Sequence, residues 1–321
     1  MAKGRTKKIE DLAEAPKTED IQRRRIIELE KQLEQCLKQL NDTRAAKFKL
    51  AVGKQKTTKG GQHCRVIIPD SHGCVIDQAA AKAFLADLEI IKPAEIVHLG
   101  DAIECGGFLA QHHTLGYVAQ TKYTFADDVA AANEFFDQIQ QRANVPFTLI
   151  AGNHERRIEN WITTQTQKNT KDAAYLASVF SVETVLNIEA RKIRLINQGE
   201  FYDNLPLPAT IKLGNCFFTH GSSTAKHAAA VNVQKFGGNI VYGHTHRADS
   251  YIIRQVKTGI IGGWSPGCLC QLQPLWNHTN PTDWSHGYGL QMVTGSGDFL
   301  HINVPIVDGQ SLLTPLIQEL K

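Results

Sequence analysis

The sequence contains no apolar run long enough to cross a membrane and no secretory signal. No window of its 321 residues approaches about 18 consecutive apolar side chains, the length of a membrane-spanning helix. The basic residues 1–8 are not followed by the apolar stretch of a signal peptide. The 7 cysteines show neither zinc-finger nor disulfide spacing, which is typical of a reducing compartment. We therefore expect a cytoplasmic protein without membrane contact, in which Cys268 and Cys270 share one face of a strand and pack in the core.

Positive charge is concentrated at the start of the chain. The whole sequence has 35 basic and 32 acidic residues, a net charge of +3. Residues 1–60 hold 16 basic and 9 acidic residues, so the rest of the chain carries a net charge of −4. A basic arm before a mildly acidic body indicates either a nucleic-acid or phosphate-rich partner, or simply a solvated segment.

A short heptad pattern lies within this arm. Its apolar residues alternate in spacing between three and four, which predicts a coiled-coil-like helix: Ile26, Leu29, Leu33, Cys36 and Leu40. Residues 21–42 would then either mediate homo-oligomerisation or pack against the body. Residues 51–61 are poor in apolar side chains and predict a linker. We expect an N-terminal helical arm over residues 1–61 and a globular domain over residues 62–321.

The first two strands of this domain end in potential metal ligands. A buried strand over residues 65–68 is followed by Asp70 and His72, and a strand over residues 95–99 is followed by Asp101. The step of 31 residues between the two aspartates is the length of one βαβ unit. Such a unit places both strands in parallel, so both aspartates emerge at the same edge of the sheet.

Three later strands end in the same way. Each is followed by potential ligands: strand 145–150 by Asn153 and His154, a hairpin over 210–219 by His220, and strand 239–242 by His244 and His246. Two imidazoles two residues apart after a glycine turn arise by chance less often than one. The repeated placement at strand ends therefore predicts a common site.

Amphipathic patterns predict four helical regions between these strands: one capped by Asp77, two inserts near residues 105–142 and 155–192, and one running from a Ser222 or Ser223 cap to Gly237. Beyond Arg191, the alternating residues 192–196 begin a region predicted to be antiparallel. Strands and helices that alternate in this manner indicate an α/β domain.

The five strand ends supply two carboxylates, one amide oxygen and four imidazoles. Seven donors suit two metal ions about 3.5–4 Å apart that share a bridging carboxylate, the arrangement used in phosphoryl hydrolysis. A mixed nitrogen and oxygen set favours manganese, iron, zinc or cobalt over magnesium or calcium, and we expect manganese first. The predicted ligands are Asp70, His72, Asp101, Asn153, His220, His244 and His246.

The ordered motifs Asp-x-His, Gly-Asp, Gly-Asn-His-Glu, His-Gly and Gly-His-Thr-His over residues 62–306 resemble the calcineurin-like metallophosphoesterase superfamily. The resemblance implies a four-layer α/β/β/α sandwich with two mixed sheets. The helical inserts and residues 284–288 also resemble bacteriophage- and prophage-encoded members, whose expected location is the host cytoplasm.

The resemblance also implies a role for each matched position. The ligands fall into two groups, with Asp70, His72 and His246 at one metal, Asn153, His220 and His244 at the other, and Asp101 bridging both. A water activated by the two metals would attack phosphorus. His154 would stabilise or protonate the leaving oxygen, so the catalytic residues are expected to be His154 and Asp101.

Expected substrate contacts are Arg156, Arg157, His112 and His113. The two histidines follow the second motif, where related nucleases place a helper histidine at a different spacing, although ordinary loop histidines are the alternative. Protein serine/threonine phosphatases carry a phosphate-binding arginine in the segment that corresponds to residues 100–106, and here Cys105 occupies its position.

These features favour a dinuclear phosphodiesterase acting on nucleic acid or a nucleotide. The alternative activity is that of a phosphomonoesterase for a small molecule or phosphoprotein. A third hypothesis, from another class, is a non-catalytic protein that holds metals only for stability.

Overall fold

A computed structural model describes residues 61–110, 121–168, 170–197, 201–202, 205–206, 209–277 and 280–319, together with Ile27 and Lys31. The chain divides into two compact units, Met1–Ala51 and Val52–Lys321. Apart from Ile27 and Lys31, the predicted arm, its heptad pattern over residues 21–42 and the linker up to residue 60 lie outside the described residues.

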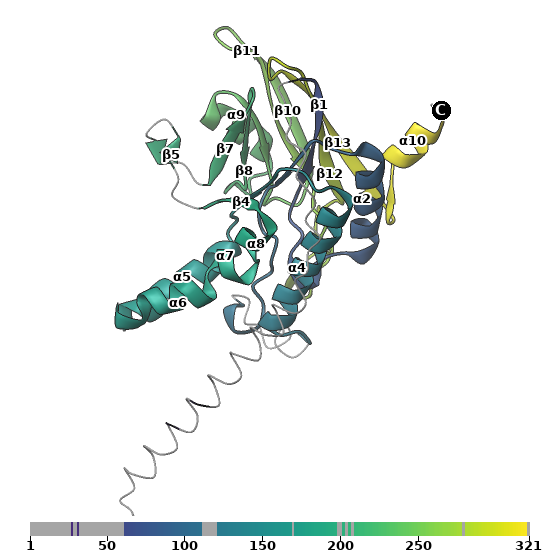
Figure 1. The fold of residues 1–321 in the computed structure, drawn as a ribbon. Helices are drawn as coiled ribbons and strands as arrows, with labels where there is room; N and C mark the ends of the chain where they lie inside the picture. The colour runs from purple at the N-terminus through teal and green to yellow at the C-terminus, as the bar shows by residue number, and fades with distance from the viewer. Residues whose placement is uncertain are drawn as a thin grey trace, which may run out of the picture. The chain divides into compact units, whose positions relative to one another are not determined.

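Two mixed β-sheets form the centre of the second unit (Figure 1). The larger sheet contains, in spatial order, β14 (Gln310–Ser311), β13 (Phe299–Val307), β12 (Gly287–Val293), β1 (His63–Ile68), β2 (Glu95–His98), β3 (Phe147–Ile150) and β4 (Ile193–Ile196). The smaller sheet contains β10 (Ala248–Gln255), β11 (Gly259–Pro266), β9 (Asn239–Tyr242), β8 (Cys216–Thr219) and β7 (Thr210–Leu213). A separate pair joins β5 (Phe201–Tyr202) to β6 (Leu205–Pro206).

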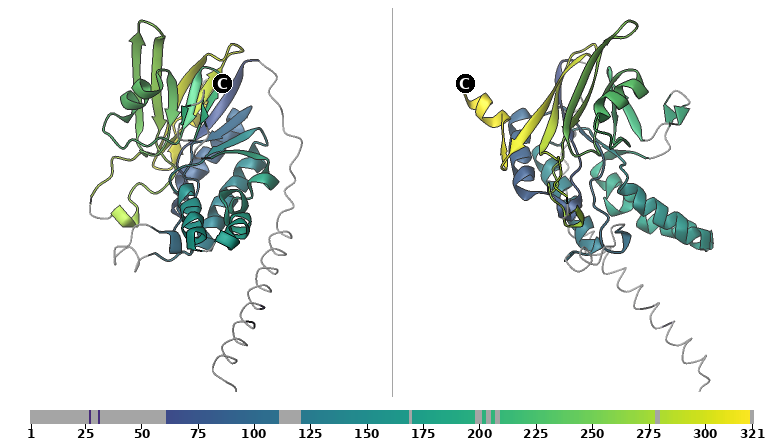
Figure 2. Two further views of the ribbon diagram at one scale, coloured as in Figure 1. Left: turned by 90° about the vertical axis from the view of Figure 1, so that its left-hand side faces the viewer. Right: turned by 180° about the vertical axis from the view of Figure 1, so that it is seen from behind.

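Helices cover the outer faces of both sheets, which confirms the predicted α/β/β/α layers. The larger sheet is covered by α2 (Gln78–Ile91) and α4 (Phe125–Arg142), followed along the chain by α5 (Glu155–Lys168), α6 (Ala173–Phe180), α7 (Val182–Val185) and α8 (Ile188–Arg191). The smaller sheet is covered by α9 (Ala228–Phe236), which Figure 2 shows against β10 and β11. The short α10 (Leu313–Glu319) follows β14.

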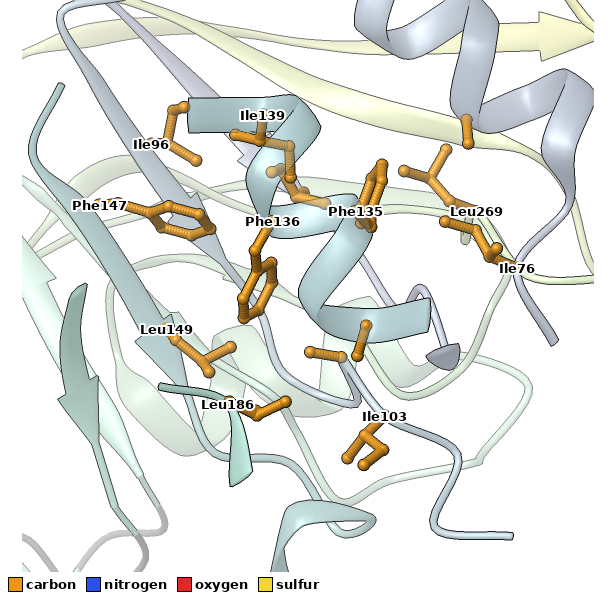
Figure 3. Packing of buried hydrophobic residues seen from close by; sticks show 14 of the residues in the cluster. Ile76, Ile96, Ile103, Phe135, Phe136, Ile139, Phe147, Leu149, Leu186 and Leu269 are labelled. Carbon is orange, nitrogen blue, oxygen red and sulfur yellow. The ribbon is translucent and has the colours of Figure 1, made fainter. Parts of the chain in front are cut away.

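Apolar side chains fill each space between these layers. In the outer layer, Phe136 of α4 packs onto Phe147 of β3 with ring centroids 5.5 Å apart (Figure 3). Between the sheets, Ile67 and Val97 of the larger sheet meet Phe218 and Val241 of the smaller one. Strands β1, β2 and β3 are therefore covered on both faces, which explains why apolar residues follow one another without alternation over residues 66–68 and 96–97.

The structure confirms some local predictions and corrects others. The Asp77 side chain caps α2 by accepting a hydrogen bond from the Ala80 N–H, and β7 and β8 form the predicted hairpin. The prediction that antiparallel pairing begins beyond Arg191 is wrong for β4, which is parallel to β3 and continues the βαβ pattern. The prediction of a serine cap for α9 is also wrong, because this helix begins after His227.

No helix among the described residues is both long and apolar enough to span a membrane.

Arg191 joins the last of the inserted helices to α4. Its side chain is fully buried and donates hydrogen bonds to Asp137 Oδ1 at 2.6 Å, to Asn133 Oδ1 at 3.1 Å and to the Leu186 carbonyl at 3.2 Å. Replacing Arg191 by leucine removes these hydrogen bonds, although Asn133 Oδ1 still accepts from Asn187 Nδ2 at 2.9 Å.

We expect Arg191→Leu to lower the free energy of unfolding by about 3 kcal/mol, measured by urea titration. Arg142→Leu is the matched control on α4, because its ion pair with Glu89 lies at the surface, and its effect should stay below about 1 kcal/mol. Equal losses from the two variants would show that the buried network makes no special contribution.

Candidate metal centre

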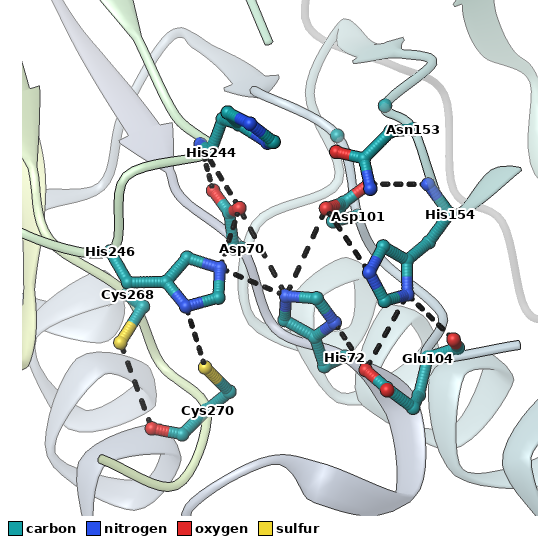
Figure 4. A network of polar contacts seen from close by, with 12 residues as sticks. Asp70, His72, Asp101, Glu104, Asn153, His154, His244, His246, Cys268 and Cys270 are labelled. Carbon is teal, nitrogen blue, oxygen red and sulfur yellow. Dashed lines mark hydrogen bonds and ion pairs between the residues drawn. The ribbon is translucent and has the colours of Figure 1, made fainter. Parts of the chain in front are cut away.

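The site lies where the carboxyl ends of strands from both sheets meet. In the larger sheet, Ile68 of β1 pairs with His98 of β2, and His98 pairs with Leu149 of β3. In the smaller sheet, Thr219 of β8 pairs with Tyr242 of β9. The residues that follow these positions therefore emerge together, and Figure 4 shows their side chains directed at one another.

The first group of predicted ligands comes from β1 and β9. His246 Nε2 lies 3.0 Å from Asp70 Oδ2 and 3.0 Å from His72 Nε2. Asp70 also accepts the backbone N–H of His244 at 3.0 Å, which fixes its carboxylate between the two sheets. All three side chains of this group are almost fully buried.

The second group comes from β3, β8 and β9. His220 Nε2 lies 2.8 Å from Asn153 Oδ1, and its Nδ1 donates to the Leu99 carbonyl at 3.0 Å. The rings of His220 and His244 lie 5.0 Å apart. Because Nδ1 of His220 is occupied by the carbonyl, its Nε2 lone pair faces the site.

Asp101 lies between the two groups. Its Oδ2 is 3.9 Å from His72 Nε2 on one side and 3.2 Å from His220 Nε2 on the other. Its Oδ1 accepts the backbone N–H of His154 at 2.8 Å. The carboxylate is thus oriented by the backbone and presents one oxygen to both groups.

Four of the seven predicted ligands adopt left-handed backbone conformations. The φ angles are 56° for His72, 50° for Asp101, 69° for His244 and 57° for His246. For a residue with a side chain, the left-handed conformation raises the free energy by about 1 kcal/mol or more. Such backbone strain is concentrated at functional sites. The strained turns at the strand ends aim the side chains back into the space between the sheets.

Buried polar groups behind the ligands hold them in place. Glu155 accepts the N–H groups of Gly152, Asp101 and Ala102 at 2.8, 2.9 and 2.7 Å, joining the loops after β2 and β3. Glu104 places Oε2 2.6 Å from His72 Nδ1, which turns Nε2 of that ring toward the site.

His154 and Arg157 line the cavity beside Asp101. His154 Nδ1 donates to the Glu104 carbonyl at 2.6 Å, so its Nε2 accepts from Arg157 Nη2 at 2.9 Å. Burial lowers the pKa of His154 to about 4 despite the nearby carboxylates of Asp101 and Glu104. The cavity has a volume of about 340 Å³.

Of the other three predicted substrate contacts, the structure describes only Arg156. Arg156 is exposed and is not among the residues that line the cavity. His112 and His113 lie outside the described residues.

The donor set fits divalent cations. Burial alone would lower the pKa of His72, yet the carboxylates of Glu104, Asp101 and Asp70 raise it to about 10. The carboxylates of Asp101 and Asp70 likewise raise the pKa of His220, to about 9, against the effect of burial. This negative field, which favours positive charge on the imidazoles, equally favours cations between them. Imidazole nitrogen and carboxylate oxygen are also the ligand types of manganese, iron, zinc and cobalt.

Sequence reasoning missed three contributors to the site. Glu104 was not assigned a role, although it follows Asp101 in the same strand-end loop. Cys270 is buried in the core as expected, but its Sγ also lies 3.8 Å from His246 Nδ1. Trp284 lies against His246 with ring centroids 4.0 Å apart, and only a tertiary contact reveals it.

Gly243 allows Asp70 to approach the backbone of the smaller sheet. A Cβ atom at this position would lie 2.4 Å from Asp70 Oδ1 and 3.3 Å from Leu99 Cβ. We expect Gly243→Ala to displace the carboxylate and weaken metal binding about 10- to 100-fold, the usual effect of disturbing a ligand's support. Isothermal titration with Mn²⁺ measures this affinity. Gly295→Ala is the control, because a Cβ there meets nothing within 4 Å, and an equal loss in both variants would contradict the argument.

The chain is similar to several known proteins. The sequence profile of the family described as calcineurin-like phosphoesterase matches residues 66–248. The Gene 54 protein of Mycobacterium phage D29 is 25% identical over 268 residues, which cover 76% of this chain and 94% of that protein. Among solved structures, a single mutant of Vps29 from Entamoeba histolytica is similar at 15% identity, with a TM-score of 0.38 over 77% of this chain and 95% of that one. YfcE, a phosphoesterase from E. coli, is similar at 14% identity, with a TM-score of 0.33 over 75% of this chain and 98% of that one.

Proposed function

The chain belongs to the calcineurin-like phosphoesterase family, and from this premise we propose that it hydrolyses phosphodiester bonds in nucleic acid or in nucleotides. Membership makes it a metal-dependent hydrolase of phosphoric esters. The observation that carries the proposal is the convergence of two groups of donors on one cavity, with Asp101 between them.

The charge of the cavity supports a diester over a monoester. Arg157 and Arg247 are the arginines among the described residues that line it, and Arg247 is neutralised by Asp283 at 3.1 Å. Where protein phosphatases carry an arginine, Cys105 is buried and its thiol donates to the His154 carbonyl at 3.1 Å. A phosphodiester has one negative charge, whereas a phosphomonoester has nearly two near neutral pH, so with the same charge from bound metal ions a monoester calls for more positive side chains.

We assign the residues complementary tasks. Two bound divalent ions, manganese being our first choice, would supply an activated water and neutralise charge on the phosphoryl oxygens. Asp70, His72 and His246 would hold one ion and Asn153, His220 and His244 the other, with Asp101 shared between them. His154, whose Nδ1 donates to the Glu104 carbonyl and whose Nε2 accepts from Arg157, would stabilise or protonate the leaving oxygen; protonation would require Nε2 to exchange the Arg157 contact for a proton.

The remaining expectations stay predictions. The basic arm would add affinity for nucleic acid, residues 21–42 would mediate homo-oligomerisation, and the protein would act in the cytoplasm. The matched phage protein supports an origin in a phage or prophage, where that compartment is the cytoplasm of the host.

The proposed activity is tested by comparing bis-p-nitrophenyl phosphate with p-nitrophenyl phosphate as substrates of the manganese-loaded protein. We expect a higher kcat/KM for the diester. A strong preference for the monoester would replace the proposal with the phosphomonoesterase alternative, for a small molecule or a phosphoprotein.

Arg157 should contribute to catalysis by contacting the phosphoryl group. We expect Arg157→Ala to lower kcat/KM for the diester about 100-fold, because an oriented cation in a buried site stabilises charge that develops in the transition state. Arg157→Lys should recover only part of this loss, since lysine lacks the planar fork. Arg156→Ala is the matched control on the exposed side of α5 and should leave kcat/KM within about twofold; a greater loss there than at Arg157 would reverse our assignment.

A further inference from the structure

The cavity continues beyond the proposed metal ligands. Its far side is lined by Thr224, Arg247, Asp283 and Trp284, from segments that lie outside the matched motifs. A volume of about 340 Å³ falls within the range of sites that hold whole small molecules. The far side is therefore available to one of the groups esterified to the phosphate.

Trp284 is held firmly on this far side. The next residue, Ser285, donates its N–H to the His246 carbonyl at 3.0 Å and accepts the Ala248 N–H on Oγ at 2.8 Å. The preceding residue, Asp283, accepts from Arg247, whose guanidinium also donates to the Ala225 carbonyl at 2.7 Å. Both neighbours of the indole are thus tied to other segments, which limits its freedom before any ligand binds.

The indole is also close to the reaction centre. Its ring lies 4.0 Å from that of His246, with an angle of 76° between the planes. A planar group that lies against Trp284 is therefore a short distance from a phosphate held at the centre. Aromatic side chains recognise nucleobases by stacking, which contributes about 1–3 kcal/mol per base with little dependence on base identity.

Building on the proposed phosphodiesterase activity, we infer that the Trp284 side of the cavity is a subsite for a nucleobase attached to the phosphodiester. Both a free nucleotide ester and single-stranded nucleic acid carry such a nucleobase next to a phosphodiester. The subsite makes the enzyme selective for nucleoside esters over simple alkyl esters, without selecting a particular base.

The test uses two substrates that share a leaving group. Thymidine 5′-(p-nitrophenyl) phosphate carries a base, whereas methyl p-nitrophenyl phosphate does not. We expect Trp284→Ala to lower kcat/KM for the thymidine ester about 5- to 150-fold relative to the methyl ester, and Trp284→Phe to retain most of the preference. Tyr175→Ala, which removes an exposed aromatic ring on α6, is the control and should leave the ratio unchanged.

The ratio of kcat/KM for the thymidine ester to kcat/KM for the methyl ester separates loss of the subsite from damage to the metal centre. Any disturbance of His246 lowers kcat/KM for both esters and leaves this ratio unchanged. Equal losses for the two esters would overturn the subsite and leave the proposed activity standing, whereas failure of the unaltered enzyme on both esters would overturn the proposed activity itself.

Repeating the comparison with a single-stranded oligothymidylate identifies the source of the base. A larger Trp284→Ala effect on the oligomer indicates nucleic acid, and a larger effect on the mononucleotide ester indicates a free nucleotide.

Discussion

Asp101→Asn is expected to lower kcat/KM by about 1,000-fold or more. The substitution preserves the shape of the side chain but removes the charge of the one carboxylate that lies between both groups of donors. Metal ions contribute several kcal/mol of transition-state stabilisation, and about 4 kcal/mol corresponds to a factor of about 1,000 in rate. Losing the shared carboxylate should also lower the number of manganese ions bound per chain below two, which elemental analysis measures.

The control for this variant is Asp298→Asn. Asp298 is also a hydrogen-bonded aspartate, but it lies in a turn and accepts from the exposed Asn215 at 2.7 Å. This variant should keep its full activity and metal content. If Asp101→Asn retains both as well, the carboxylate is not shared by two ions and the dinuclear account is wrong.

His154→Ala is expected to lower kcat by about 10²- to 10⁴-fold while leaving the metal content unchanged. The residue lies beside Asp101, but its Nδ1 donates to the Glu104 carbonyl and its Nε2 accepts from Arg157, so neither ring nitrogen is assigned to a metal ion. Positioned acid–base side chains contribute rate factors of this size. Steady-state kinetics combined with elemental analysis separates this outcome from that of Asp101→Asn, in which both quantities fall.

This variant also addresses the third hypothesis, that the protein holds metals only for stability. A protein with that role would show no turnover with or without His154. His63→Ala is the histidine control, since His63 pairs with Glu95 near the start of β1. Its kcat should match that of the unaltered enzyme, and a comparable loss at both positions would argue against a specific role for His154.

The ligands that directly follow apolar strands were the easiest site residues to predict. Residues that reach the site only through tertiary contacts were the hardest. Asp70, Asp101 and His220 follow short apolar strands, so their placement at a sheet edge depends on local pattern and on the handedness of the crossover. Arg157 and Arg156 are adjacent in sequence and identical in chemistry, yet only Arg157 reaches the cavity. Which arginine faces inward depends on the orientation of α5 and on the bonds that Arg157 makes to His154 and Glu104.

The amino-acid sequence by itself determined the types of donor, their positions at strand ends and the α/β class, because these depend on short-range periodicity; the four layers followed only from the resemblance to a known family. The tertiary structure alone decided how the two sheets oppose their edges, which brings Asp70 within hydrogen-bonding distance of His246 across more than half of the chain. It also decided the left-handed turns at four ligands and the contacts of Glu104, Cys270 and Trp284 with the site. The left-handed turns and these contacts depend on packing between segments that are distant in sequence. That packing offsets the local backbone strain, and it cannot be predicted from the residues on either side of each position.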